Sequence, residues 1–238
     1  MKPTTYIFTA LHLIASVGAF TVNQLSLPIR RTQLGAAPSS VEELISMPET
    51  WGPIKQELDH VPVFSCANDQ GQPLQYNLGG KPVAFFFLDI DAAKDELEKA
   101  KTEAKLEGLS LLPFPLGEIF EMGAKQMAVI IPSSSALNAA GAPPGMNPIG
   151  QQVPLFGCME IAATQPDGTS MTPMFFSQDE AESAMNMALS EAGGGDSSKF
   201  KVNVVPLVQA VQLGATNKEK TFIFEAPKSS LEYLRSIQ

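Results

Sequence analysis

The segment VPVFSC at residues 61–66 occurs again, almost unchanged, as VPLFGC at residues 153–158. Further segments recur in the same order along the chain: FFFLDIDAAKDEL (85–97) and MFFSQDEAESAM (174–185), FPLGEIFEMG (114–123) and VPLVQAVQLG (205–214), AVIIPSSSAL (128–137) and TFIFEAPKSSL (221–231). Several segments repeated in one order are the sequence signature of a duplicated structural unit. We therefore expect two lobes of similar architecture.

Each copy shows the same order of predicted elements, namely strands, a helix, and then a strand, a short helix and a strand. The Gly79-Gly80 pair predicts a hairpin, and the consecutive residues Phe85–Phe87 indicate a strand that is covered on both faces. In the first copy we expect strands at 61–67, 73–78, 82–88, 109–114 and 128–131, a helix at 91–106 capped by Asp91, and a helix at 116–122 ended by Gly123. In the second copy we expect helices at 178–190 and 228–237. The pattern predicts an α+β fold of two similar lobes, each a small, mostly antiparallel sheet packed with short helices.

The segments outside the repeat complete the predicted organisation. Residues 41–60 form an N-terminal helical segment, because Ser40 and Glu43 have the spacing of a capping box before prolines that break the helix, Pro48 and Pro53. Glycine and proline punctuate residues 138–152, which we expect to link lobe 1 (61–137) to lobe 2 (153–238). Lobe 2 departs from the repeat at MEIAATQPDGTS (159–170), which replaces the predicted hairpin.

The first nineteen residues have the composition of a secretory signal peptide. Lys2 precedes an apolar run from Tyr6 to Val17, and small residues follow it. This order predicts cleavage between Ala19 and Phe20. We therefore expect residues 1–19 to be removed.

Residues 20–40 have the composition of a transit peptide, since they contain Arg30 and Arg31, hydroxylated residues and no acid. A signal peptide followed by a transit peptide, with the aromatic Phe20 directly after the cleavage site, resembles the diatom-type bipartite leader of secondary plastids. The resemblance implies a plastid location, in the intermembrane or periplastid space.

The composition argues against several classes of function. Histidine occurs only at positions 12 and 60 and cysteine only at 66 and 158, which are too few for a zinc cluster or a Cys-His or Ser-His-Asp constellation. No glycine-rich phosphate-binding motif is present, and the net charge of −9 argues against nucleic-acid binding. No apolar run is long enough to cross a bilayer as a helix, which leaves peripheral membrane association compatible with the sequence. We expect no enzyme, no metal and no cofactor.

The doubled motifs resemble the Tic22 family of plastid and cyanobacterial protein-import components. They comprise a Val-Pro-Val-Phe strand, the Gly80-Lys81-Pro82 start of an apolar strand, an acidic helix start, and a Pro-Leu turn before a short helix. The similarity covers residues 61–238. It implies two like halves with apolar grooves, no catalytic residue, and a soluble protein that acts between plastid membranes. Its expected partners are unfolded preproteins and subunits of the plastid translocon.

Flexible methionine and phenylalanine side chains can cover the apolar segments of many different clients. The candidate groove residues are Phe114, Met122, Met127, Met174, Met185 and Met187. The alternative is that each of them faces the core, as apolar residues at regular spacing usually do. Cys66 and Cys158 occupy equivalent positions, where they are either buried free thiols or a disulfide pair.

The sequence leaves three possible functions for the chain. The first is chaperone-like binding of preproteins in transit, and the second is a scaffold that links the outer and inner translocon complexes. The third is an enzyme domain with a small-molecule pocket, which would need converging polar groups that this composition scarcely provides.

Overall fold

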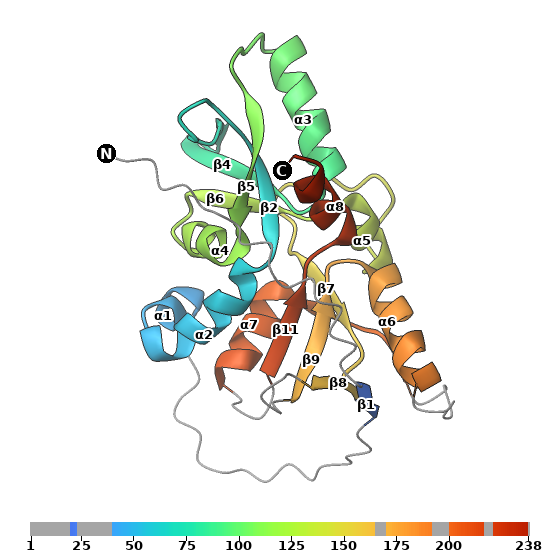
Figure 1. The fold of residues 1–238 in the computed structure, drawn as a ribbon. Helices are drawn as coiled ribbons and strands as arrows, with labels where there is room; N and C mark the ends of the chain where they lie inside the picture. Colours follow the sequence, from blue (N-terminus) through green and yellow to red (C-terminus); the bar gives the residue numbers. More distant parts are fainter. Residues whose placement is uncertain (1–19, 23–39, 165–169, 192–199, 217–220, 238) are drawn as a thin grey trace.

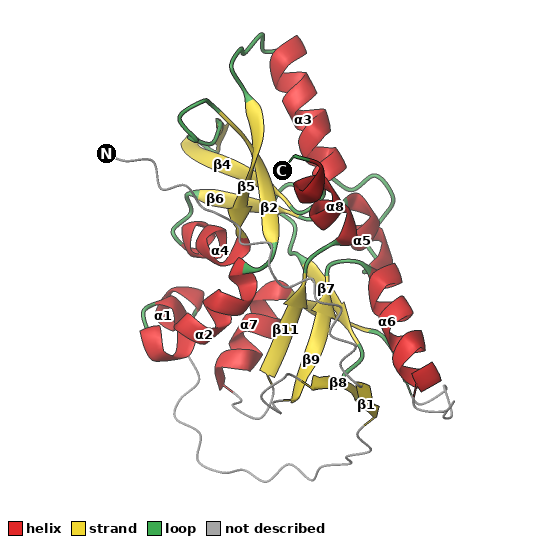
Figure 2. Cartoon of the chain, in the orientation of Figure 1, coloured by secondary structure: helices red, strands yellow, loops and turns green. Residues whose placement is uncertain are grey.

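The computed structural model describes residues 20–22, 40–164, 170–191, 200–216 and 221–237. Two β-sheets lie one beyond the other along the molecule (Figure 1). The helices α1, α2, α4 and α7 gather on one side of the sheets, and α3, α5, α6 and α8 gather on the other (Figure 2). The described chain is therefore an α+β structure with two lobes, as predicted.

Lobe 1 contains a five-stranded sheet in the order β3-β4-β2-β5, with β6 paired to β4. The β4–β6 pair is parallel and all other pairs are antiparallel. The elements are β2 (Pro62–Ala67), β3 (Gln75–Leu78), β4 (Lys81–Phe87), α3 (Ile90–Thr102), β5 (Ser110–Pro115), α4 (Leu116–Ala124), β6 (Ala128–Ile131) and α5 (Ser134–Ala139).

Lobe 2 repeats this topology, with strands in the order β8-β9-β7-β10 and β11 parallel to β9. A further strand, β1 (Phe20–Val22), pairs with β8 at the edge of the sheet. The remaining elements are β7 (Pro154–Gly157), β8 (Ile161–Thr164), β9 (Ser170–Phe175), α6 (Gln178–Glu191), β10 (Asn203–Pro206), α7 (Leu207–Thr216), β11 (Thr221–Glu225) and α8 (Lys228–Ser236).

The two sheets are paired in the same register. Aromatic and proline pairs occupy matching positions: Phe64–Phe87 and Phe156–Phe175, Pro62–Pro115 and Pro154–Pro206. The next helix begins in the same way in both lobes, with the amide of Leu116 donating to Val61 O at 2.9 Å and that of Leu207 donating to Val153 O at 2.8 Å. A proline has no amide hydrogen, so these pairs lie where the strand amides point away from each other. The predicted duplication is confirmed.

Three predictions about helix ends were wrong. Helix α3 ends at Thr102 rather than at residue 106. Helix α3 begins at Ile90 rather than at Asp91, because the carboxylate of Asp89 accepts the amide of Asp91 at 2.9 Å and caps the helix. Helix α4 continues through Gly123 to Ala124, since one glycine costs a helix only about 1 kcal/mol and packing outweighs that. Helix ends depend on local hydrogen bonds that residue spacing does not reveal.

Two further predictions were wrong. Pro53 does not break the N-terminal segment but lies inside α2 (Pro48–Asp59), which buries Trp51 and Leu58 on either side of it. In lobe 2, the hairpin expected to be lost is present, with Ala163 opposite Met171 in the β8–β9 pair. Helix α5 was not predicted, although Ser133 caps it by accepting the amide of Ala136 at 3.0 Å.

The N-terminal segment joins the two lobes through a shared core. Helix α1 (Val41–Ile45) starts at Ser40, whose hydroxyl accepts the amide of Glu43 at 3.1 Å, as the capping box predicted. Helices α1 and α2 contact both α4 of lobe 1 and α7 of lobe 2. Leu44, Trp51 and Leu58 are buried there together with apolar residues from both sheets. Burial of this shared core stabilises the two lobes as one unit.

The contact between α2 and α4 is especially close. Carboxylate Oδ1 of Asp59 accepts the amide of Glu118 at 3.2 Å and caps α4, whose own N-cap residue is a proline without a capping side chain. A Cβ on Gly117 would lie 2.6 Å from the same carboxylate and 2.7 Å from the carbonyl of Lys55. Only glycine fits this position without a shift of the backbone.

The last helix of each lobe packs on the other lobe. Helix α8 lies against β2 and α3 of lobe 1, where Tyr233 packs edge-on against Phe64 with ring centroids 5.5 Å apart. Helix α5 places Ala136 in a small cluster with Phe156 and Ala181 of lobe 2. This reciprocal exchange adds a second connection between the lobes, beyond α1 and α2.

Candidate functional site

The candidate groove residues do not converge on one site. Met174 is fully buried and its sulfur lies beneath Gly157, so it is a core residue and does not face a client. Phe114 is half-buried and packs edge-on against Phe86 at 5.3 Å, while Met122 of α4 packs against the shared core. For these three residues the structure places the side chain in or against the core.

The other three candidates are accessible, in two different places. Met127, after α4, is 47% exposed, and Met187, on α6, is 57% exposed. Met185 is half-buried on α6. Met185 lines the pocket described below, and a role of the accessible candidates in binding stays a prediction.

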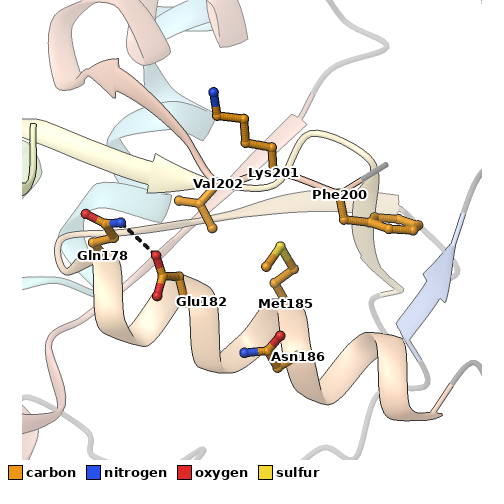
Figure 3. A pocket seen from close by; sticks show the side chains of 7 residues that line it. All are labelled: Gln178, Glu182, Met185, Asn186, Phe200, Lys201 and Val202. Carbon is orange, nitrogen blue, oxygen red and sulfur yellow. Dashed lines mark hydrogen bonds between the residues drawn. The ribbon is translucent and has the colours of Figure 1, made fainter. Parts of the chain in front are cut away.

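A pocket of about 290 Å³ lies between α6 and the extended residues that lead into β10. Figure 3 shows α6 on one side and residues 200–202 on the other. The lining residues are Gln178, Glu182, Met185, Asn186, Phe200, Lys201 and Val202. The mixture of three apolar side chains with two amides, one carboxylate and one ammonium is suited to an amphipathic group.

The polar side of the pocket belongs to α6. The Gln178 amide Nε2 donates to Glu182 Oε1 at 2.6 Å, which fixes the carboxylate at the pocket rim (Figure 3). In the same view the Lys201 side chain extends away from α6. The rim that faces the pocket from α6 is therefore acidic, and a positively charged group is favoured beside it.

A smaller void of about 10 Å³ lies deeper, on the inner side of Met185. It is lined by Cys158, Ile161, Pro173, Phe175, Ala181, Ala184 and Met185. This volume is about that of one water molecule, so the void holds no ligand.

Both cysteines are free and buried, so the disulfide alternative is not realised. Burial raises the pKa of the Cys66 thiol to about 11, and the nearby Glu96 adds to the effect. Burial also raises the pKa of Cys158, whose thiol donates to Glu160 Oε2 at 3.2 Å. Both groups stay protonated at neutral pH and lack the thiolate that nucleophilic catalysis requires.

The titratable groups with raised pKa include two carboxyls. Burial raises the pKa of Glu225 at the end of β11, and the charges of Glu180 and Glu57 raise it further. Burial raises the pKa of Glu57, which the charge of His60 partly offsets. His60 is exposed at the end of α2, outside the pocket. The described residues contain no group of three or more His, Cys, Asp or Glu side chains that could hold a metal ion.

The sequence matches no family model and no curated protein. Solved structures do resemble the chain. Tic22 from Plasmodium falciparum aligns with a TM-score of 0.62 and 20% sequence identity, over 77% of this chain and 96% of that chain. The described chain has a Tic22-like fold. Tic22 from Anabaena, a protein of protein transport, aligns with a TM-score of 0.57 and 16% identity, over 79% of this chain and 97% of that chain.

The Tic22-like fold was predicted, but the pocket was not. One signal for it was present in the repeat. When Phe87 is aligned with Phe175, the helix residues Ile90 and Lys94 of lobe 1 correspond to Gln178 and Glu182 of lobe 2. The loss of an isoleucine that is buried in lobe 1 indicates that the helix of lobe 2 covers less apolar surface.

Most of the predicted leader, residues 1–19 and 23–39, lies outside the described residues. Phe20 lies in β1. Among the described residues, no helix is long and apolar enough to cross a membrane. Cleavage at Ala19 and Phe20 stays a prediction.

Proposed function

We propose that this chain is a non-enzymatic component of preprotein import into a plastid, where it binds translocating preproteins in a chaperone-like manner between envelope membranes. The observation that supports this most is the likeness to two Tic22 structures, which extends over almost their entire lengths. Such a likeness concerns the fold, and the role in import is inferred from it together with the features below.

The accessible apolar side chains support client binding. Met127 and Met187 are exposed, and Met185 lines the pocket beside Phe200 and Val202. Methionine side chains adapt to many partner shapes, which suits a protein that binds segments of unrelated preproteins. Apolar burial yields about 25 cal/mol per Å², so a few covered side chains give weak and reversible binding.

The charge supports the same partners. The chain carries a net charge of −9, and the leader that we predict for it is basic and contains no acid before Glu42. An acidic surface attracts such segments and raises their rate of encounter. Attraction of this kind weakens as salt rises.

The test is suppression of aggregation by the purified full-length chain. An unfolded, basic client is diluted from denaturant with and without a several-fold molar excess of the chain, and light scattering is followed in the absence of nucleotide. We expect scattering to decrease, and the decrease to shrink at high salt. Unchanged scattering at every ratio would contradict the proposal that the chain binds clients, and the scaffold alternative would remain. That alternative predicts that translocon subunits, but no preproteins, co-purify with the chain.

The proposed location has its own test. A fluorescent protein fused behind residues 1–40 should enter a plastid compartment, and Phe20→Ala should leave the fusion outside it. Arg30→Lys serves as the control, because it preserves the basic charge and should leave import unchanged. Equal import of the Phe20→Ala fusion would contradict the secondary-plastid leader but not client binding.

A further inference from the structure

The duplication itself indicates what the lobe 2 pocket accommodates. With Phe87 aligned on Phe175, Leu97 of α3 corresponds to Met185 of α6. With Pro115 aligned on Pro206, Leu111 corresponds to Val202. Two of the residues that line the lobe 2 pocket, Met185 and Val202, are thus counterparts of residues in the outer cluster of lobe 1.

In lobe 1 the same space is filled by α8. Tyr233 and Leu234 pack against the cluster that contains Phe64 and Leu111. The ring of Tyr233 meets Phe64 edge-on, with an interplanar angle of 84°, and the ammonium of Lys94 lies 5.5 Å from its centroid. An aromatic ring therefore occupies this position, with a cation beside it.

In lobe 2 the counterpart of α8 is α5, which is too short to place a ring at this position. Aligning Ile131 with Glu225, which end equivalent strands, places Ala139 at the position of Tyr233 and Ala140 at that of Leu234. Helix α5 ends at Ala139, and Gly141 follows with a positive φ of 94°. In the described residues of α5 and directly after it, no ring stands at the position of Tyr233. The counterparts of Lys94 and Leu97 on α6, Glu182 and Met185, line the pocket of about 290 Å³.

The charge beside this space is reversed between the lobes. Lys94, the cation over the ring in lobe 1, corresponds to Glu182, whose carboxylate lines the pocket. Asp179 and Glu180 in the first turn of α6 do not line the pocket, whereas Lys201 does, with a side chain that extends away from α6. An incoming ring would therefore bind best when its own chain supplies the cation.

We propose that the lobe 2 pocket binds an aromatic side chain of a basic client segment, which takes the position that Tyr233 takes in lobe 1. The ring inserts between Met185 and Val202, and a lysine or arginine near it in the client pairs with Glu182. This inference rests on the proposed function and specifies the client chemistry that one lobe recognises.

The test uses the full-length chain and a fluorescein-labelled, acid-free peptide with one tyrosine flanked by arginines, followed by fluorescence anisotropy. Asn186→Trp places a large ring in the pocket from an exposed position of α6, and we expect it to weaken peptide binding about tenfold or more. The matched control is Glu98→Trp, at the equivalent exposed position of α3, where α8 already fills the space. It should bind like the unmodified chain.

Two further measurements separate the ring from the charge. A peptide with alanine in place of tyrosine should bind as weakly to the unmodified chain as the original peptide binds to Asn186→Trp. Glu182→Gln should weaken binding of the arginine peptide about two- to fivefold and leave an arginine-free tyrosine peptide unaffected.

Equal affinities for the chain before and after Asn186→Trp would overturn the pocket proposal, as would absence of peptide binding. If the chain nevertheless suppresses client aggregation, the proposed function stands and clients bind elsewhere. If neither peptide binding nor suppression is observed, the proposed function fails together with the pocket.

Discussion

The outer layers of the two lobes are built on the same backbone plan but are filled differently. In lobe 1, α3 covers one continuous cluster of large side chains that includes Phe64, Phe85 and Phe87, and α8 closes it. In lobe 2, the corresponding layer divides into two small clusters, and three of the buried residues are alanines: Ala136, Ala181 and Ala188. Strand register was therefore preserved after duplication while side-chain volume changed. The pocket between α6 and residues 200–202 lies in the copy with the smaller side chains.

The strongest test of this comparison is to truncate Phe64 in lobe 1 and its counterpart Phe156 in lobe 2. Both side chains are fully buried. Phe64→Ala should lower the free energy of unfolding by about 4–5 kcal/mol, because it leaves a cavity in a cluster of rigid, large side chains. Phe156→Ala should cost less, about 3 kcal/mol, because its neighbours are small and can move toward the space. Urea unfolding of both variants measures the difference.

A control for aromatic packing is Tyr233→Phe, which keeps the edge-on contact with Phe64 and should change stability little. Equal losses for Phe64→Ala and Phe156→Ala would mean that the outer layer of lobe 2 is packed as firmly as that of lobe 1. The pocket would then be a feature of the surface and not of loose packing.

The duplication shows how far the sequence alone can be interpreted. Proline pairs and phenylalanines at fixed distances revealed the repeat, because Pro62, Pro115 and their counterparts constrain the backbone in both copies. Such residues impose local geometry, and local geometry can be predicted from sequence. The α+β class and the two lobes followed from them.

The candidate site could not be derived in the same way. Met174 and Met187 are alike in sequence, but one is fully buried and the other is 57% exposed. The pocket depends on where α5 ends and which lobe it covers, and that exchange of helices is a tertiary contact with no local signal. Sequence reasoning therefore found Met185 without finding the surface that it lines.

The lobes also differ in how closely α2 packs on α4 of lobe 1 and on α7 of lobe 2. Exchanging the residue types at one pair of equivalent positions in α4 and α7 tests this difference. With Leu116 aligned on Leu207, Gly117 of α4 corresponds to Val208 of α7, which is 38% exposed. Gly117→Val should lower the free energy of unfolding by about 2–3 kcal/mol, because its Cβ would meet the backbone of Lys55. Val208→Gly should cost about 1 kcal/mol or less, the typical penalty for glycine in a helix. Thermal unfolding of both variants measures the two effects. Similar losses of stability would show that α2 packs equally closely on the two lobes.

The smallest expected effect concerns Glu225, which in lobe 2 takes the position of the buried Ile131 in lobe 1. Its pKa is raised in the folded chain by burial and by Glu180 and Glu57, so the folded state binds its proton more tightly than the unfolded state does. Stability therefore falls as pH rises from the ordinary value of 4.5 through the raised pKa, and the full penalty is present above it.

Glu225→Gln removes that penalty, so we expect it to raise the urea midpoint at neutral pH and to leave the midpoint nearly unchanged at about pH 4, where the carboxyl is protonated in both states. Glu107→Gln, at an exposed position, should shift the midpoint at neither pH. A gain of equal size at both pH values would mean that the benefit of glutamine comes from its hydrogen bonds and not from the missing charge. Lobe 2 would then tolerate a half-buried carboxylate at the position that lobe 1 fills with isoleucine, and the two lobes would differ in shape alone.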